Sequence, residues 1–146
     1  MRILKVLLLV LVLALVTGCS CKAKRIGSNV PYATDGGPLA DINFAFDSYS
    51  LDSNAKARLD ANYEWLVENG RATIKVEGHC DERGTNEYNM ALGAKRAQAA
   101  LDYLIGKGLD SNRASTISYG EELPLDPASN EAAWAKNRRV HFDVTE

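Results

Sequence analysis

The sequence lacks an apolar run long enough to cross a bilayer, which requires about 20 residues. Its one long run, 6–16, holds 11 residues near the amino terminus. Basic residues are not in excess either, because 17 Lys and Arg stand against 19 Asp and Glu, a formal charge of −2. A nucleic-acid-binding surface is usually basic. We therefore expect no nucleic-acid partner.

Histidine is also scarce, with only His79 and His141 in the whole chain. Metal sites built from His and Cys need these residues at characteristic spacings, and no such spacing is present. Residues 79–82 have the sequence His-Cys-Asp-Glu, but neighbours in a strand point to opposite faces of a sheet. These side chains therefore do not converge on one ion, and His79 does not activate Cys80 as a nucleophile. We expect no catalytic activity, no metal and no cofactor.

The amino terminus has the features of an export signal. A short basic region, 2–5, precedes the apolar run 6–16. The segment VTGC at 16–19 follows, and it resembles the lipobox of bacterial lipoproteins. This resemblance implies that a signal peptide, 1–18, is cleaved and that Cys19 receives fatty acyl chains such as palmitate. The alternative is an ordinary secretory signal with a nearby unmodified cysteine.

The next segment, 19–39, is interpreted as a lipidated amino terminus and flexible linker. Gly, Pro, Ser and Lys are frequent in it and apolar periodicity is absent. Fully extended, it would reach on the order of 70 Å at about 3.5 Å per residue. The folded domain is then expected to be 40–146. Cys21 and Cys80 could pair in an oxidising periplasm; otherwise Cys80 is a small, partly buried residue of the domain.

The domain is expected to begin with a strand and a helix. Alternation of apolar and polar residues predicts the strand at 41–46. Asp52 or Ser53 is placed to cap the helix, which ends near Gly70. The residues expected to be buried are Ile42, Phe44 and Phe46 in the strand and Ala55, Leu59, Leu66 and Val67 in the helix, with Tyr63 and Trp65 at its edge.

The central part of the chain has the pattern of strand, turn and helix. Alternation across 73–77 predicts the strand, and glycines at 78 and 84 mark a polar turn. Thr85 or Asn86 is placed to cap a helix that runs to about 105, where Gly106 and Gly108 end it. Its apolar face is expected to hold Leu92, Ala97, Leu101 and Leu104.

Short elements complete the domain. We expect a strand at 116–120, a loop at 121–129, a helix at 131–137 capped by Asn130, and a last strand at 139–145. The order β-α-β-α-β-(α)-β predicts an α/β (α+β) two-layer sandwich with helices on one face of the sheet.

The central turn also suggests a binding site. It places Asp81 and Arg83 beside a helix amino terminus, where free backbone amides attract anions. Arg96 lies farther along the same helix, and its guanidinium could hold a carboxylate in a bidentate fork. A carboxylate for an ammonium and an arginine for a carboxylate together suit an amino-acid head group. The simpler alternative is a charged turn with a surface arginine on a solvated helix.

Three stretches carry a resemblance to a known family. The segment GHCDERGTNEYNMALGAKRAQAALDYLIGKGL, 78–109, strongly resembles the peptidoglycan-binding segment of OmpA-like domains. The resemblance extends upstream through FAFDSYSLDSNAKARLDANYEWL and downstream through ISYGEELPLDPASNEAAWAKNRRV, so it covers about 40–146. Within the OmpA-like family, the sequence looks most like the peptidoglycan-associated lipoproteins (Pal). The resemblance implies the OmpA-like fold with a mixed sheet.

The resemblance also implies a ligand, the diaminopimelate of the peptidoglycan stem peptide. This residue carries an ammonium and a carboxylate on the end that the glycan does not use. Position by position, Asp81 is expected to accept a hydrogen bond from the ammonium. Arg96 is expected to pair with the carboxylate, helped by amides of the turn. The other residues at matching positions are Phe46, Asp47, Thr85, Asn89, Leu92 and Arg138.

A location and partners follow from the same resemblance. It implies a lipid-anchored protein of the cell outer membrane that faces the periplasm, and Ser20 after the lipidated cysteine is compatible with export there. Two or more acyl chains anchor a protein stably. Pal-type lipoproteins engage TolB and the Tol system in envelope integrity and cell division, with a TolB contact that overlaps the wall-binding face.

Two alternatives use the same fold. A flagellar stator-type protein would carry the domain behind a transmembrane helix with an intramembrane carboxylate, and the run 6–16 provides neither. The second alternative is a structural outer-membrane lipoprotein whose OmpA-like domain binds a protein partner rather than the wall. The presence of both Asp81 and Arg96 argues against it.

Overall fold

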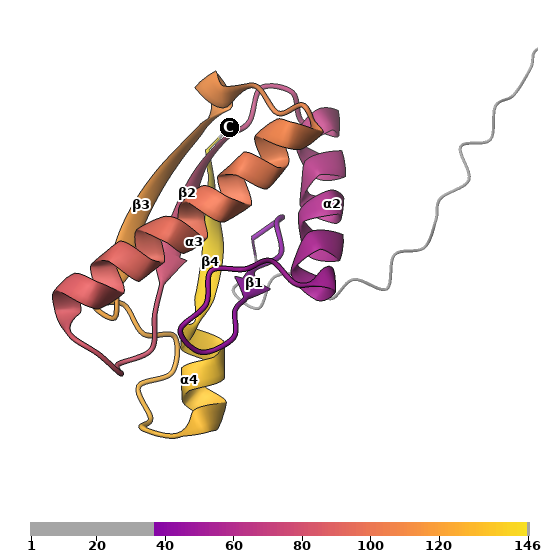
Figure 1. Cartoon of the computed structure of the whole chain (residues 1–146). Helices are drawn as coiled ribbons and strands as arrows, with labels where there is room; N and C mark the ends of the chain where they lie inside the picture. Colours follow the sequence, from indigo (N-terminus) through magenta and orange to yellow (C-terminus); the bar gives the residue numbers. More distant parts are fainter. Residues whose placement is uncertain (1–36, 146) are drawn as a thin grey trace, which may run out of the picture.

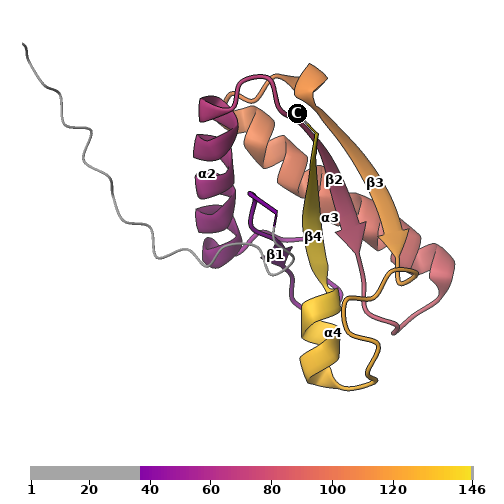
Figure 2. The same cartoon turned by 180° about the vertical axis from the view of Figure 1, so that it is seen from behind.

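The computed structural model describes residues 37–145, so the expected signal peptide, Cys19, Cys21 and most of the expected linker lie outside the described residues. A four-stranded sheet forms one layer, and two helices cover one of its faces (Figure 1, Figure 2). The expected two-layer α+β sandwich is confirmed. Its elements in chain order are β1 (Ile42–Asn43), α2 (Ser53–Glu68), β2 (Thr73–His79), α3 (Asn86–Lys107), η1 (Ser111–Arg113), β3 (Ala114–Gly120), α4 (Glu131–Asn137) and β4 (Arg139–Thr145).

The sheet is mixed, as expected, with the strand order β1-β4-β2-β3. β2 and β3 run parallel, and α3 forms the crossover that parallel neighbours require. β4 is antiparallel to both β1 and β2 and lies between them. The last strand therefore joins the two ends of the domain within one sheet.

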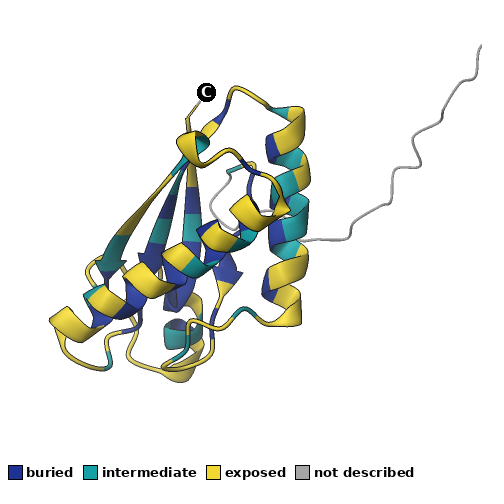
Figure 3. Cartoon of the chain, turned by 45° about the horizontal axis from the view of Figure 1, so that its top comes forward, coloured by how far each residue is buried: buried dark blue, intermediate teal, exposed yellow. Residues whose placement is uncertain are grey.

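One face of the sheet forms the core with α2 and α3. Val76 of β2 and Phe142 of β4 are opposite each other in the register, and both are buried. Leu59 of α2 and Leu104 of α3 pack into the same cluster. Figure 3 shows that both helices have buried positions along one side and exposed positions along the other. The helix α4 lies at one end of the sheet, beside the turn between β2 and α3 (Figure 1). None of the helices within 37–145 is both long and apolar enough to cross a membrane.

The helices begin and end at capping residues that the sequence predicts. Asp52, Thr85 and Asn130 precede α2, α3 and α4. The side-chain oxygen of each accepts a hydrogen bond from the backbone amide three residues later, at 2.7, 3.2 and 3.1 Å. After α3, Gly108 has a φ of 116°, a left-handed conformation that glycine adopts without strain.

The first strand is shorter than expected. β1 has two residues, and Phe46, which was expected on its buried face, is 58% exposed. The backbone leaves the sheet after Asn43 and turns at Asp47, whose φ is 52°. Ile42 and Phe44 remain buried. Alternation of apolar residues does not distinguish a strand from an extended segment that leaves the sheet.

The buried stripe of α2 also differs at one position, because Val67 is 59% exposed and Asn62 is buried instead. A buried asparagine is stable here because both its amide oxygen and its amide nitrogen are hydrogen-bonded. Its Oδ1 accepts from Ala40 N at 2.8 Å, and its Nδ2 donates to Ala40 O at 2.9 Å. The other three expected residues are buried, namely Ala55, Leu59 and Leu66.

β2 and α3 meet at two glycines. A Cβ on Gly78 would lie 1.9 Å from the carbonyl oxygen of Gly93, and a Cβ on Gly93 would lie 2.3 Å from Ser118 Oγ. Real Cβ atoms do not come this close to other atoms. The two glycines therefore let α3 lie directly on the sheet, next to the turn that leads into it.

Candidate binding site

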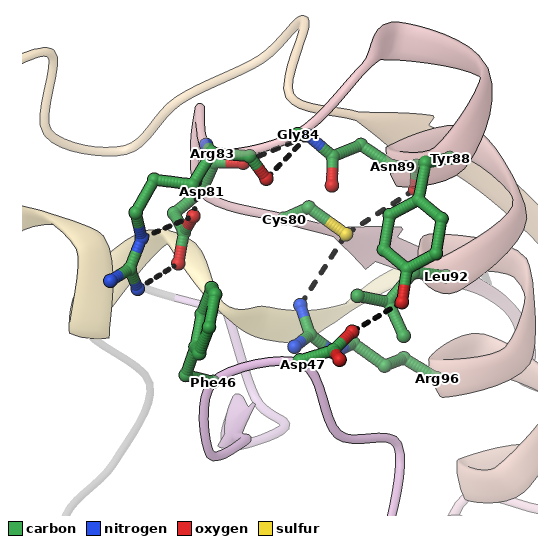
Figure 4. A pocket seen from close by; sticks show the side chains of 10 residues that line it. All are labelled: Phe46, Asp47, Cys80, Asp81, Arg83, Gly84, Tyr88, Asn89, Leu92 and Arg96. Carbon is green, nitrogen blue, oxygen red and sulfur yellow. Dashed lines mark hydrogen bonds and ion pairs between the residues drawn. The ribbon is translucent and has the colours of Figure 1, made fainter.

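A cleft of about 220 Å³ opens where three segments meet (Figure 4). These segments are the loop after β1, the turn between β2 and α3, and the first half of α3. The cleft has charges of both signs and an apolar side. It brings together six of the eight residues that the sequence places at the peptidoglycan site, namely Phe46, Asp47, Asp81, Asn89, Leu92 and Arg96.

Asp81 is held by two arginines and is only 4% exposed. Arg83 donates to Oδ1 from its backbone N at 3.1 Å and from Nε at 3.0 Å, and to Oδ2 from Nη2 at 2.8 Å. Arg138 donates to Oδ2 from Nη1 at 3.2 Å. Burial by itself would raise the pKa of Asp81, but these hydrogen bonds outweigh it and hold the pKa below its ordinary value. Asp81 is therefore ionised at neutral pH.

Arg96 lies at the base of the cleft and is 1% exposed. Its guanidinium donates to three backbone carbonyls, those of Ser48 at 2.8 Å, His79 at 2.9 Å and Ala45 at 3.2 Å. Nη1 also lies 3.4 Å from Cys80 Sγ. Because a guanidinium has five N–H donors, most of its fork is used by the protein itself. Burial lowers the pKa of Arg96 from its ordinary value, and the side chain supplies a fixed positive charge beneath the cleft.

Asp47 and Tyr88 lie at the exposed side of the cleft. Tyr88 Oη donates a hydrogen bond to Asp47 Oδ1, and this bond raises the pKa of Tyr88. In contrast to Asp81, Asp47 forms no ion pair with any residue of the described part. Its carboxylate is therefore open to a cation that enters the cleft.

Asn89 joins α3 to the turn between β2 and α3. Its Nδ2 donates to the backbone oxygens of Asp81 at 3.2 Å and Arg83 at 3.3 Å. The two remaining expected residues do not line the cleft. Thr85 caps α3, and Arg138 lies behind Asp81 and also donates to Phe44 O at 3.0 Å. Both support the turn that carries the site.

Four lining residues were not among the expected site residues. The spacing of Tyr88, Leu92 and Arg96 along one face of α3 would have indicated Tyr88. Arg83 was placed near the site by its position in the turn, but its contact with Phe46 depends on the fold. Cys80 was expected to be partly buried but is only 3% exposed, and burial raises the pKa of its thiol. The four residues are Cys80, Arg83, Gly84 and Tyr88.

Comparison with known sequences gives a consistent family. The OmpA family profile matches residues 43–138. A peptidoglycan-associated lipoprotein from Rhizobium meliloti (strain 1021) is 42% identical over 145 residues, which cover 90% of this chain and 82% of that protein. A peptidoglycan-associated lipoprotein from Haemophilus influenzae is 41% identical over 135 residues, which cover 87% of this chain and 88% of that protein.

Solved structures agree with the sequence comparison. The crystal structure of the peptidoglycan-associated lipoprotein from Burkholderia pseudomallei is similar with a TM-score of 0.69 at 37% identity, covering 72% of this chain and 89% of that one. The C-terminal domain of Helicobacter pylori MotB also has a TM-score of 0.69, but at 23% identity it indicates the fold alone. The chain belongs to the OmpA family and, within it, to the peptidoglycan-associated lipoproteins.

Proposed function

We propose that this chain binds peptidoglycan non-covalently and tethers the outer membrane to the cell wall. The observation that carries the proposal is the cleft itself, in which carboxylates and guanidinium groups line one small volume. The cleft lies within the segment that matches the OmpA family. The relatives are named for an association with peptidoglycan.

The ligand that fits this chemistry is the diaminopimelate of the stem peptide. Arg96 supplies positive charge for its carboxylate from the base of the cleft, and the amino terminus of α3 adds to that charge. Asp81 and Asp47 supply negative charge for its ammonium. Leu92 and Phe46 offer apolar surface to the carbon chain between the charges. The role is binding, and we assign no catalytic step to these residues.

Selectivity follows from the cost of burying charge. An ammonium or a carboxylate that enters the cleft loses its water and must find a partner there. Each hydrogen bond to a charged group then contributes about 1.5–3 kcal/mol net. A ligand that lacks one of the two charges forms fewer of these bonds, so we expect the cleft to bind it more weakly.

The rest of the chain supplies the tether. Cys19 carries the lipid anchor in the outer membrane, and the linker lets the domain reach the wall from the periplasmic side. TolB and the Tol system are the partners during cell division. Replacement of Cys19 by serine is expected to remove acylation and release the protein from the membrane fraction, which fractionation and mass measurement of the mature protein would show. A Cys19→Ser protein that stays membrane-bound would contradict the anchor.

The alternative function is that of an outer-membrane lipoprotein whose domain binds a protein partner rather than the wall. Phe46 and Tyr88 favour it as exposed aromatic side chains at the cleft mouth, since such residues are enriched in protein interfaces. The two functions differ in what enters the cleft, and binding of a purified wall fragment separates them.

Calorimetric titration of the chain from residue 20 onward tests the ligand directly. The first ligand is a wall fragment that ends in diaminopimelate, and the second is the same fragment with lysine, which lacks the carboxylate on that end. We expect the first to bind at least tenfold more tightly, since about 1.4 kcal/mol corresponds to a factor of ten. Equal affinities, or no binding by either fragment, would overturn the proposed ligand.

The matched variants are Asp47→Asn and Glu64→Gln. Each removes one negative charge, but only Asp47 lines the cleft, whereas Glu64 lies on the exposed face of α2. We expect Asp47→Asn to weaken binding of the diaminopimelate fragment and Glu64→Gln to leave it unchanged. The same loss in both would indicate an effect of overall charge.

A further inference from the structure

Four charged side chains form a closed ring beside the cleft. Asp81 Oδ2 lies 2.8 Å from Arg83 Nη2 and 3.2 Å from Arg138 Nη1. Glu131 Oε1 lies 2.8 Å from Arg138 Nη2, and its Oε2 lies 3.6 Å from Arg83 Nη1. The ring joins the turn between β2 and α3 to the short helix α4. Its members differ in exposure, and Arg83 and Glu131 are the accessible ones.

Arg83 is the member of the ring that lines the cleft. Its guanidinium stacks between two aromatic rings, 4.0 Å from the centroid of Phe46 and 4.3 Å from that of Trp134. Contact with the aromatic rings holds a guanidinium in place. Its N–H donors lie in the plane of the guanidinium itself, so they can still form hydrogen bonds. The Arg83 side chain is 31% exposed. It is therefore a positioned cation that solvent and ligands can reach.

Arg96 is less available than Arg83 for hydrogen bonds to a ligand. Three backbone carbonyls and one sulfur already accept from its guanidinium. Asp81 is likewise not free to accept hydrogen bonds from a ligand, because arginine donors occupy both of its oxygens. To pair with Asp81, a ligand with an ammonium alone would have to displace Arg83 and would leave that guanidinium without Asp81. A ligand with both charges avoids this cost.

We propose that the ion pair between Asp81 and Arg83 opens to admit a zwitterion, and that Arg83 is a ligand-binding and specificity-determining residue. The ammonium of the ligand takes the place of Arg83 at Asp81, and the carboxylate on the same carbon takes the place of Asp81 at Arg83. One ion pair is exchanged for two, so no charge is left without a partner. Phe46 and Trp134 keep the guanidinium near the cleft throughout the exchange. This inference rests on the proposed function and assigns a second arginine to its ligand.

The test is a cycle of two proteins and two ligands. Wild type and Arg83→Gln, both from residue 20 onward, are titrated with the diaminopimelate fragment and with its lysine counterpart. For diaminopimelate, we expect Arg83→Gln to bind about tenfold more weakly, because a charge-assisted contact to the carboxylate is lost. For lysine, we expect affinity that is unchanged or increased, because no carboxylate is present and the competing cation has been removed.

Arg71→Gln is the matched control, since it removes the same charge from the exposed turn after α2, and it should change neither affinity. An equal loss for both ligands in Arg83→Gln would make Arg83 a merely structural residue and overturn the inference. Tighter binding of diaminopimelate by Arg83→Gln would also overturn it, because Arg83 would then be only a competitor. If wild type binds neither fragment, the proposed function itself fails, and this inference fails with it.

Discussion

At the scale of single residues, Arg96 serves the fold as well as the site. The sequence hypothesis treats it as a guanidinium that waits for a carboxylate. The structure shows that it also joins the loop after β1 to the end of β2 through the carbonyls of Ala45, Ser48 and His79. Loss of this side chain would leave one buried and two partly buried carbonyls without this donor, which costs free energy. Loss of binding in an Arg96 variant therefore does not by itself identify a ligand contact.

The first prediction concerns the stability of Arg96→Ala. Because one buried and two partly buried backbone carbonyls lose their donor, we expect the free energy of unfolding to fall by about 3 kcal/mol. Urea denaturation followed by circular dichroism would measure the change. Lys95→Ala is the control, since Lys95 is the exposed neighbour of Arg96 on α3 and should change stability by less than about 0.5 kcal/mol. Similar midpoints for both variants would contradict the structural role of Arg96.

His79 is a buried ionisable residue outside the cleft. It stacks on Tyr119 with 5.5 Å between the ring centroids, and neither ring nitrogen has a hydrogen-bond partner among residues 37–145. Burial, helped by the nearby charges of Arg139 and His141, lowers its pKa from 6.5 to about 3. Glu77 Oε2, 3.9 Å from Nε2, opposes this shift only weakly. His79 is therefore neutral in the folded protein.

The second prediction is a pH dependence of stability. The unfolded chain protonates His79 near pH 6.5, whereas the folded protein does so only near pH 3. Between these values the unfolded state binds more protons, so the free energy of unfolding falls as the pH decreases through this window. The variant His79→Phe keeps an aromatic ring against Tyr119 and removes the proton. We expect its stability to fall less than that of wild type between pH 7 and pH 4; parallel curves would contradict the assignment.

The sequence predicted which charged residues line the cleft better than it predicted which neighbours they contact. Asp81 and Arg96 follow from the turn and from helical spacing, because both are local properties of the chain. The position of Trp134 against Arg83 depends on α4 folding back beside the turn, and no local pattern contains that information. The eight expected site residues remain a prediction until a ligand is measured.

At the scale of elements, the contact between β2 and α3 positions the cleft. Gly78 and Gly93 let the helix lie on the strand, and the turn between these two elements carries Asp81 and Arg83. Capping residues made α2, α3 and α4 predictable, since caps are local signals. The length of β1 was not predictable, because pairing with β4 across almost 100 residues of sequence decides where it ends. The prediction that Val67 is buried was wrong for a different reason. The buried positions of α2 already follow the helical period without it, at Ala55, Leu59, Asn62 and Leu66.

The third prediction concerns this helix and strand contact. In Gly78→Ala, the new Cβ would lie 1.9 Å from the Gly93 carbonyl oxygen, so β2 and α3 must separate. We expect a loss of about 3 kcal/mol in the free energy of unfolding. In Gly106→Ala, nothing lies within 4 Å of the new Cβ, and a gain of up to about 1 kcal/mol is expected from helix propensity. Thermal unfolding would compare the two, and equal destabilisation would contradict the packing argument.

At the scale of the whole molecule, the proposed tether precedes the folded domain that the structure describes over residues 37–145. The core of the described part is built from residues 39–142, with Val144 packed at its edge. Removing the basic residues of the expected signal leaves 15 basic against 19 acidic residues, a formal charge of −4. Non-specific attraction to an anionic polymer is therefore weak. We therefore expect wall binding to come from the cleft rather than from overall charge.

The most direct test of wall binding is co-sedimentation of the chain from residue 20 onward with purified, diaminopimelate-containing sacculi. Wild type is compared with Asp81→Asn, Asp47→Asn and the charge-matched Glu64→Gln at equal concentration. We expect wild type and Glu64→Gln to sediment with the wall and both cleft variants to remain mostly in the supernatant. If wild type stays in solution, or if all four proteins sediment alike, the cleft is not the wall-binding site.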